Sequence, residues 1–292
     1  MPHAQRYSQV FAIGIVLNVI YIAVEVSYGF AINSSVLLAD AGHNTSDVLS
    51  LLLAWGAIWI APKKPSGKYT YGLRKATILA SMINGMLILG AAGLITWNAI
   101  QKIQNPVKIP GQIIIIVAAV GMIINAATAL LFSKDRKKDL NIKGAFLHMA
   151  ADTVVSLGVV IGGLIMTYFG YYWLDPVLSF AIVAIVIYSV WGLLVDSVNL
   201  AVDAVPENIN LSQVRLYLKE IQKVKEVHDL HVWAISTTQT ALTAHLVVPG
   251  GHTDQFIYEI QKKLKQKFNI DHATLQIEQA YEDDKYRHNN GL

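Results

Sequence analysis

Two pairs of side chains that could bind a metal ion have the same spacing in this sequence. His43 is followed four residues later by Asp47, and His148 is followed four residues later by Asp152. Residues four apart lie on one face of a helix, so each pair points at the same neighbour. Both pairs lie inside apolar runs, where ionisable groups are costly to bury and usually serve a function. Each pair is therefore predicted to supply half of a metal site.

The chemistry of this ligand set suits a divalent cation. Two neutral imidazoles and two carboxylates form a tetrahedral set with net charge −2, which offsets the charge of the ion and the cost of burying it. Zinc fits best, with cadmium, cobalt and iron as alternatives, whereas magnesium and manganese prefer octahedral oxygen ligands. Because every ligand comes from the protein, no position is left for a reacting water. The site is thus predicted to bind and transport an ion rather than to catalyse hydrolysis.

Other polar residues in the apolar runs have weaker claims to a function. Asp40 lies one turn before His43 and is interpreted as an access or gating residue, or as a helix-packing group. Glu25, Asn125 and Asp175 are expected to be structural or to line the ion pathway. The alternative for the two pairs themselves is that they only hydrogen-bond between helices.

Composition separates a membrane part from a water-soluble part. The 292 residues are 54% hydrophobic and only 15% charged, which favours an integral membrane protein over a soluble globular one. The last ninety residues hold twelve of the 20 acidic side chains. The formal charge of +3 is spread without a basic, aromatic groove, which argues against nucleic acid as a partner. The chain has no cysteine, so any metal ligand must be an imidazole, carboxylate, hydroxyl or carbonyl group.

The apolar runs predict an all-α bundle of six transmembrane spans within residues 1–203, the transport domain. The loops at 62–75 and 133–143 carry five basic residues each, whereas the loops on the other side carry few. The basic loops and both termini are therefore expected to face the cytoplasm. The spans are expected at about 10–32, 36–61, 76–100, 112–132, 144–169 and 173–195.

Residues 204–292 are predicted to form a small α+β cytosolic domain for metal binding and dimerisation. Helical and strand periodicities alternate in the order α-β-β-α-β. Three strands backed by two helices predict a sandwich of ferredoxin-like type. The expected elements lie at 211–224, 227–236, 241–248, 253–268 and 273–279.

Six stretches together form a distinctive set. They are Leu38-Ala-Asp-Ala-Gly-His-Asn-Thr-Ser-Asp47, Tyr69-Thr-Tyr-Gly72, Ala145-Phe-Leu-His-Met-Ala-Ala-Asp152, Val227-His-Asp-Leu-His-Val-Trp233, Ala244-His245 and His272-Ala-Thr-Leu-Gln-Ile-Glu278. In these stretches the chain resembles the cation diffusion facilitator family, in particular its zinc-transporting bacterial branch of cobalt–zinc–cadmium resistance type. The resemblance covers nearly the whole chain.

The resemblance implies a homodimer that exports zinc from the cytoplasm by alternating access, in exchange for protons. It implies a transport site at His43, Asp47, His148 and Asp152, and a tail domain that dimerises and binds regulatory zinc. The chain departs from the family after Tyr-Gly: many members have a histidine and an acidic residue there, whereas Leu73-Arg-Lys-Ala-Thr77 offers no ligand. A metal site in this loop is not expected.

Histidines of the tail domain form a second candidate site. Strand alternation places His228 and His231 on opposite faces of the first strand, so the tail histidines are not expected to share one centre. The preferred set is therefore His228 with His245 and Glu278, joined by a residue from the loop before the last strand; surface histidines without metal are the alternative. The candidate cytosolic ligands are His228, His245, Asp271, His272 and Glu278.

These observations predict a proton-coupled zinc exporter of a bacterial inner membrane, a transporter and not an enzyme. Protons compete with the ion for the same histidine and aspartate atoms, so the proton gradient would supply the energy. Two alternatives stay open at this point. One is an intramembrane zinc hydrolase, which needs an open coordination position, and the other is a zinc sensor or passive channel without coupled transport.

Overall fold

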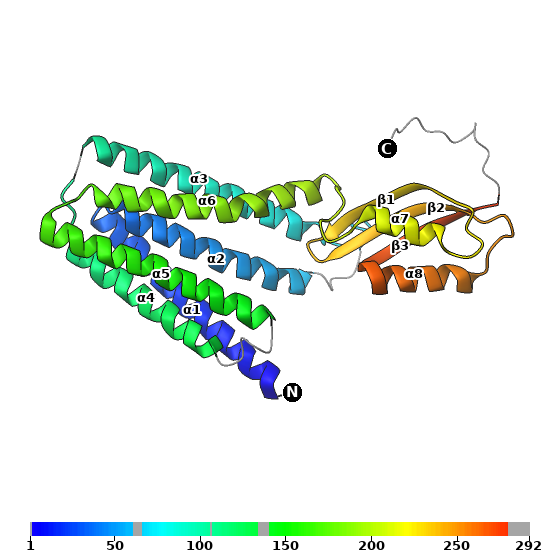
Figure 1. Ribbon diagram of the computed structural model, residues 1–292, viewed down its shortest axis with the longest axis horizontal. Helices are drawn as coiled ribbons and strands as arrows, with labels where there is room; N and C mark the ends of the chain where they lie inside the picture. Colours follow the sequence, from blue (N-terminus) through cyan, green and yellow to red (C-terminus); the bar gives the residue numbers. More distant parts are fainter. Residues whose placement is uncertain (1, 61–65, 106, 134–139, 280–292) are drawn as a thin grey trace. The chain divides into compact units, whose positions relative to one another are not determined.

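The computed structural model describes residues 2–60, 66–105, 107–133 and 140–279. Six long helices come first in the chain, and a small α/β part follows (Figure 1). The basic loop at 62–75 is described from Ser66 onward, and the loop at 133–143 lies mostly outside the described residues. The long helices are α1 (Pro2–Ala31), α2 (Ser35–Ile60), α3 (Ala76–Gln104), α4 (Gly111–Ser133), α5 (Leu140–Phe169) and α6 (Leu174–Ala201).

The chain divides into two compact units. One unit holds residues 1–52 and 83–193, and the other holds residues 53–82 and 194–292. The second unit therefore contains the end of α2, the start of α3 and the end of α6 together with the C-terminal domain. The single domain boundary after residue 203 stays a prediction.

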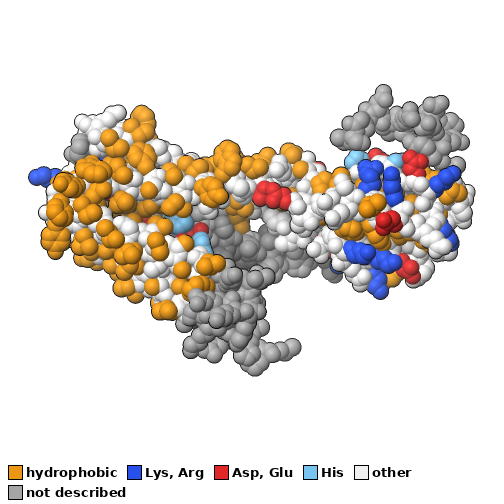
Figure 2. Space-filling view, viewed as in Figure 1, with side chains coloured by type: hydrophobic (Ala, Val, Ile, Leu, Met, Phe, Trp, Pro, Cys, Tyr) orange, Lys and Arg blue, Asp and Glu red, His pale blue; other side chains and the backbone are white. Residues whose placement is uncertain are grey.

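The helical part has the surface of a membrane protein. Among the described residues, four helices are long and apolar enough to cross a membrane, and a fifth apolar helix is shorter. Their outward side chains are apolar too: Leu94 is 74% exposed and Tyr188 is 88% exposed. Figure 2 shows hydrophobic side chains over most of the visible surface of this part. A helical membrane domain, in which every helix satisfies its own backbone groups, is confirmed, and the number of six spans stays a prediction. The four helices are Ala76–Gln104, Gly111–Leu130, Phe146–Phe169 and Leu174–Ala201, and the shorter one is Val16–Ala31.

Helices α4 and α5 approach each other closely at glycines. A Cβ atom on Gly111, the first residue of α4, would lie 2.6 Å from the backbone oxygen of Gly163 on α5. A Cβ atom on Gly163 would lie 2.8 Å from the side chain of Ile115. Small residues let two membrane helices pack closely where water supplies no hydrophobic driving force. Since α5 carries His148 and Asp152, this packing helps to fix half of the candidate site.

Substituting Gly111→Ala is expected to destabilise the helical unit by about 1–3 kcal/mol, because the added carbon meets backbone and forces α4 away from α5. Gly158→Ala on α5 is the matched control, since none of the described atoms lies within 4 Å of the Cβ added there. Thermal unfolding of both full-length variants in detergent measures the difference. Equal melting temperatures for the two variants would contradict the close contact.

The C-terminal domain is a three-stranded sheet with two helices, in the predicted order α-β-β-α-β. The strands lie in the order β1-β2-β3, with β1 antiparallel and β3 parallel to β2. Its ferredoxin-like type stays a prediction. The elements are α7 (Leu211–Lys219), β1 (Glu226–Ser236), β2 (Gln239–Val247), α8 (Asp254–Phe268) and β3 (Ile270–Glu278).

Both helices of this domain cover the same face of the sheet. Leu218 of α7 and Leu264 of α8 are fully buried in one core with Leu242 and Leu246 of β2. Successive side chains of a strand point to opposite faces. His245, one residue before Leu246, therefore lies on the face away from α7 and α8.

Candidate metal centre

The four ligands predicted from their spacing meet between α2 and α5. His43 Nε2 lies 3.1 Å from Asp152 Oδ1 and 4.0 Å from Asp47 Oδ2. His148 Nε2 lies 3.3 Å from Asp47 Oδ2 and 3.7 Å from Asp152 Oδ2. Each histidine is thus closer to the aspartate of the other helix than to that of its own helix. Imidazoles and carboxylates alternate around one centre.

This centre is buried on one side and accessible on the other. His43 and Asp152 are 7% and 4% exposed, whereas the side chain of His148 is 45% exposed. Ligand atoms of His43, Asp47 and Asp152 all lie within 4.8 Å of one another. Asp47 Oδ2 is buried and, apart from its contacts with the two imidazoles, accepts no hydrogen bond from the described residues, so a cation bound between the imidazoles can share it. The residues fit a divalent ion, which would neutralise carboxylates that are costly to bury alone.

A further acidic group is buried beside this centre. Glu25 of α1 accepts hydrogen bonds from the Tyr21 hydroxyl at 2.9 Å and from Asn44 Nδ2 at 3.2 Å. Asn44 follows His43, so Glu25 connects α1 to the helix that carries two of the candidate ligands. Asp40 is only 1% exposed and lies in the interior rather than at an open mouth. Its role in access or gating stays a prediction.

A second cluster is formed by one residue from each strand of the C-terminal sheet. His228 of β1, His245 of β2 and Glu278 of β3 place ligand atoms within 4.8 Å of one another. Glu278 lies between the two imidazoles: Oε2 is 3.2 Å from His228 Nε2, and Oε1 is 3.0 Å from His245 Nδ1. Two imidazoles and a carboxylate can hold a divalent ion with one position left for another ligand.

A β-bulge in β1 changes which histidines share a face. His228 pairs with His245 and His231 pairs with Thr243, so β1 has one extra residue between these pairs. Asp229 takes up the bulge with a φ of 48°, in the left-handed region. Paired residues share a face, and His245 and Thr243 are two apart on β2, so His228 and His231 lie on the same face. The interpretation that they lie on opposite faces is wrong, because it assumed unbroken alternation.

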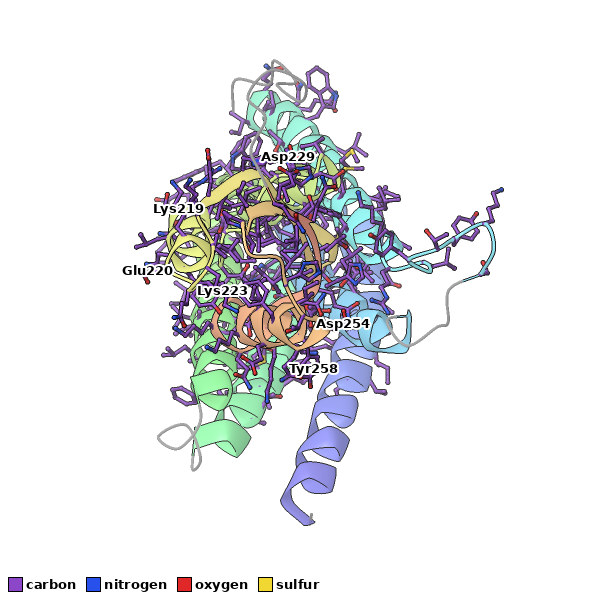
Figure 3. The ribbon with its side chains drawn as sticks, turned by 90° about the vertical axis from the view of Figure 1, so that its right-hand side faces the viewer. Lys219, Glu220, Lys223, Asp229, Asp254 and Tyr258 are labelled. Carbon is purple, nitrogen blue, oxygen red and sulfur yellow. The ribbon has the colours of Figure 1, made fainter. Side chains whose placement is uncertain are left out.

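Asp229 is a neighbour of this cluster that the sequence reasoning did not select. Its carboxylate lies 2.8 Å from His231 Nε2 and 3.4 Å from His245 Nε2. The hydrogen bond from His231 holds the pKa of Asp229 below its usual value. Figure 3 labels Asp229 at the strands, apart from the labelled residues of α7 and α8. The signal that could have identified it is an acidic residue close to histidines on two paired strands.

Asp271 and His272 lie away from the cluster, which corrects the larger predicted set. The register of β3 places His272 six residues before Glu278, roughly 20 Å along a strand. Asp271 Oδ2 accepts a hydrogen bond from the backbone N–H of Thr240 at 3.3 Å. The His272 ring faces the Tyr71 ring, with their centroids 5.8 Å apart. Neither residue can contribute to an ion bound at Glu278 in this arrangement.

Comparison with known proteins assigns both parts of the chain to the same kind of protein. Residues 11–200 match the family profile described as the cation efflux transmembrane domain. Residues 206–280 match the profile described as the cation efflux protein, cytoplasmic domain.

Three relatives match over most of their length. The cadmium, cobalt and zinc/H(+)-K(+) antiporter of Bacillus subtilis strain 168 is 31% identical, over 92% of this chain and 88% of the relative. The metal cation efflux system protein CzcD of Cupriavidus metallidurans is 32% identical, over 92% and 85%. The zinc transporter ZitB of Escherichia coli K12 is 33% identical, over 88% and 83%.

Proposed function

Because the chain belongs to the cation efflux family, and is thus a multi-pass membrane transporter of metal cations and not an enzyme, we propose that it exports zinc in exchange for protons. The observation that carries the proposal is the alternating ring of His43, Asp152, His148 and Asp47. A ring of two imidazoles and two carboxylates suits zinc, with cadmium, cobalt and iron as further substrates. The relatives named for zinc, cadmium and cobalt support this choice.

The exchange follows from what the four ligands require. Zinc binds to neutral imidazoles and ionised carboxylates, so a proton on any of these groups competes with the ion. In the proposed cycle, zinc enters the ring from the cytoplasm, and protons from outside displace it when the ring faces outward. The protonated ring then returns to the inward-facing state and releases its protons. Alternating access to one site thereby couples the two fluxes.

The same proposal sets the arrangement in the membrane. Helices α1–α6 are proposed to be six spans of a bacterial inner membrane, with both termini in the cytoplasm. Residues 1–203 then form the transport domain, and residues 204–292 form a ferredoxin-like cytosolic domain through which two copies dimerise. The match of residues 206–280 to a cytoplasmic domain of this family supports the orientation. We further propose that His228, His245 and Glu278 bind regulatory zinc.

Zinc flux into proteoliposomes tests the exchange. Purified full-length protein is reconstituted into vesicles that contain a zinc-sensitive dye, and zinc is added outside at several imposed pH differences. Uptake is expected to be fastest with an acidic lumen, because protons leave as zinc enters, and a luminal pH dye is expected to report alkalinisation on zinc addition. Uptake that ignores the pH difference would indicate a passive channel. Zinc binding without uptake would indicate a sensor.

A further inference from the structure

The turn between α1 and α2 is held by a buried carboxylate from α6. Asp175 Oδ1 accepts hydrogen bonds from the Ser34 hydroxyl at 2.6 Å and from the backbone N–H of Val36 at 3.2 Å. Asp175 Oδ2 accepts one from the backbone N–H of Ser35 at 2.9 Å. Ser34, Ser35, Val36 and Asp175 are all fully buried. Since α2 begins at Ser35, Asp175 satisfies N–H groups at the start of α2 that have no partner within that helix.

A buried lysine completes this cluster from α3. Lys102 Nζ donates to the backbone oxygen of Asn33 and, at 2.7 Å, to the Ser35 hydroxyl. It lies 3.8 Å from Asp175 Oδ2. The Ser35 hydroxyl in turn donates to Asn98 Oδ1 at 2.7 Å. The negative charge of Asp175 thus faces both the ammonium group and the positive end of the α2 helix dipole.

The position of this cluster links the two helices that carry the candidate ligands. His43 and Asp47 follow Ser35 on α2 by eight and twelve residues, which is about 12 and 18 Å along a helix. Asp175 lies six residues after Phe169, the last residue of α5. Its contacts therefore join the start of α2 to the segment that directly follows α5. A shift of α2 at this end moves its ligands relative to those of α5.

We propose that Asp175 is a positioning residue for zinc transport: by capping the first turn of α2, it fixes the depth and rotation at which α2 presents His43 and Asp47. This inference rests on the proposed transport site. Asp175 touches none of the four ligands, so it acts through the helix and not on the ion. Its pairing with Lys102 allows the role in positioning to be separated from the cost of a buried charge.

The test compares Asp175→Asn with Ser179→Ala in the flux assay. Asparagine keeps the shape of the side chain but can accept from the N–H groups through only one oxygen. Ser179 lies one turn further along α6, is fully buried, and its hydroxyl has no hydrogen-bond partner among the described residues. Asp175→Asn is expected to raise the zinc concentration for half-maximal flux about tenfold, the equivalent of about 1.4 kcal/mol and of one helix cap. Ser179→Ala is expected to leave it unchanged.

A second variant removes the charge effect. Asp175→Asn leaves the Lys102 ammonium group buried without its carboxylate, which lowers stability whether or not Asp175 positions α2. In Asp175→Asn/Lys102→Gln this charge is absent, so the melting temperature is expected to recover while the half-maximal zinc concentration stays raised. If the melting temperature and the half-maximal zinc concentration of the double variant both return to wild-type values, Asp175 serves stability alone and the proposal is overturned. If Asp175→Asn does not fold, the double variant and Ser34→Ala, expected to raise the half-maximal concentration two- to threefold, carry the same test.

The outcome also separates this inference from the function on which it rests. Flux that survives alanine at both Asp47 and Asp152 would remove the transport site and the inference with it. If the variant with alanine at both Asp47 and Asp152 loses flux, but the kinetic constants of Asp175→Asn equal those of Ser179→Ala, only the positioning role is overturned.

Discussion

Alanine at both Asp47 and Asp152 is expected to reduce zinc flux to the level of protein-free vesicles. The remaining imidazoles of His43 and His148 carry no negative charge, so a dication between α2 and α5 would lose both carboxylates that contact it and compensate its charge. An uncompensated buried charge costs on the order of several kcal/mol, and each 1.4 kcal/mol is tenfold in affinity. The affinity of the site for zinc is therefore expected to fall by more than about 100-fold. Dye-loaded proteoliposomes measure the resulting loss of zinc flux.

Asp196→Ala is the control for this loss. Asp196 is a partly buried carboxylate on α6 that belongs to neither candidate cluster. Its removal tests whether flux depends on acidic residues of the helices in general, and the flux is expected to persist. Zinc uptake at the wild-type rate in the Asp47→Ala/Asp152→Ala protein would remove the ring from the mechanism.

Zinc binding at the C-terminal sheet is expected to disappear in His245→Ala. The measurement uses the full-length Asp47→Ala/Asp152→Ala protein, whose transport site is expected to bind no zinc. Isothermal titration calorimetry then reports zinc binding at the C-terminal sheet alone. His245 supplies one of three ligands and faces Glu278 at 3.0 Å, so its loss is expected to weaken zinc binding by at least about 100-fold. The affinity of the intact cluster is expected to fall as pH is lowered, because both histidines must be neutral to bind.

His272→Ala is the matched control at this sheet. His272 was a candidate ligand by sequence, but it lies six residues from Glu278 along β3, and its substitution is expected to leave zinc affinity unchanged. Equal affinities in the His245→Ala and His272→Ala proteins would show that the cluster binds no zinc. A loss in His272→Ala alone would place the ion at the other end of the strand.

The helical candidate site could be predicted because its geometry is local. The spacing of His43 and Asp47 fixes a shared helix face, and the repeat at His148 and Asp152 identifies the partner without knowledge of the fold. The contact of each histidine with the aspartate of the opposite helix could not be predicted. It depends on how α2 and α5 are placed against each other, which packing elsewhere in the unit determines.

The candidate site on the sheet was harder to predict, because which side chains share a face depends on the register of the strands. A single bulge at Asp229 reverses the expected relation of His228 to His231, and nothing in the local composition marks it. The distance from His272 to Glu278 is fixed by β3 being one continuous strand, Ile270–Glu278, although a loop was expected at its start. Asp175 was expected to be structural or to line the ion pathway, but its contact with α2 spans 140 residues of sequence and could not be predicted.

The polar first half of α2 sets a requirement for membrane insertion during synthesis. An aspartate near the middle of a lone helix raises the free energy of membrane insertion by up to about 2.5–3.5 kcal/mol, whereas a leucine lowers it by only about 0.3–0.6 kcal/mol. With Asp40 and Asp47, α2 is therefore a poor substrate for insertion alone in the proposed six-span arrangement. α1 leaves the ribosome first, and its Glu25 accepts a hydrogen bond from Asn44 of α2. Nascent α2 is thus expected to enter the lipid as a hairpin with α1.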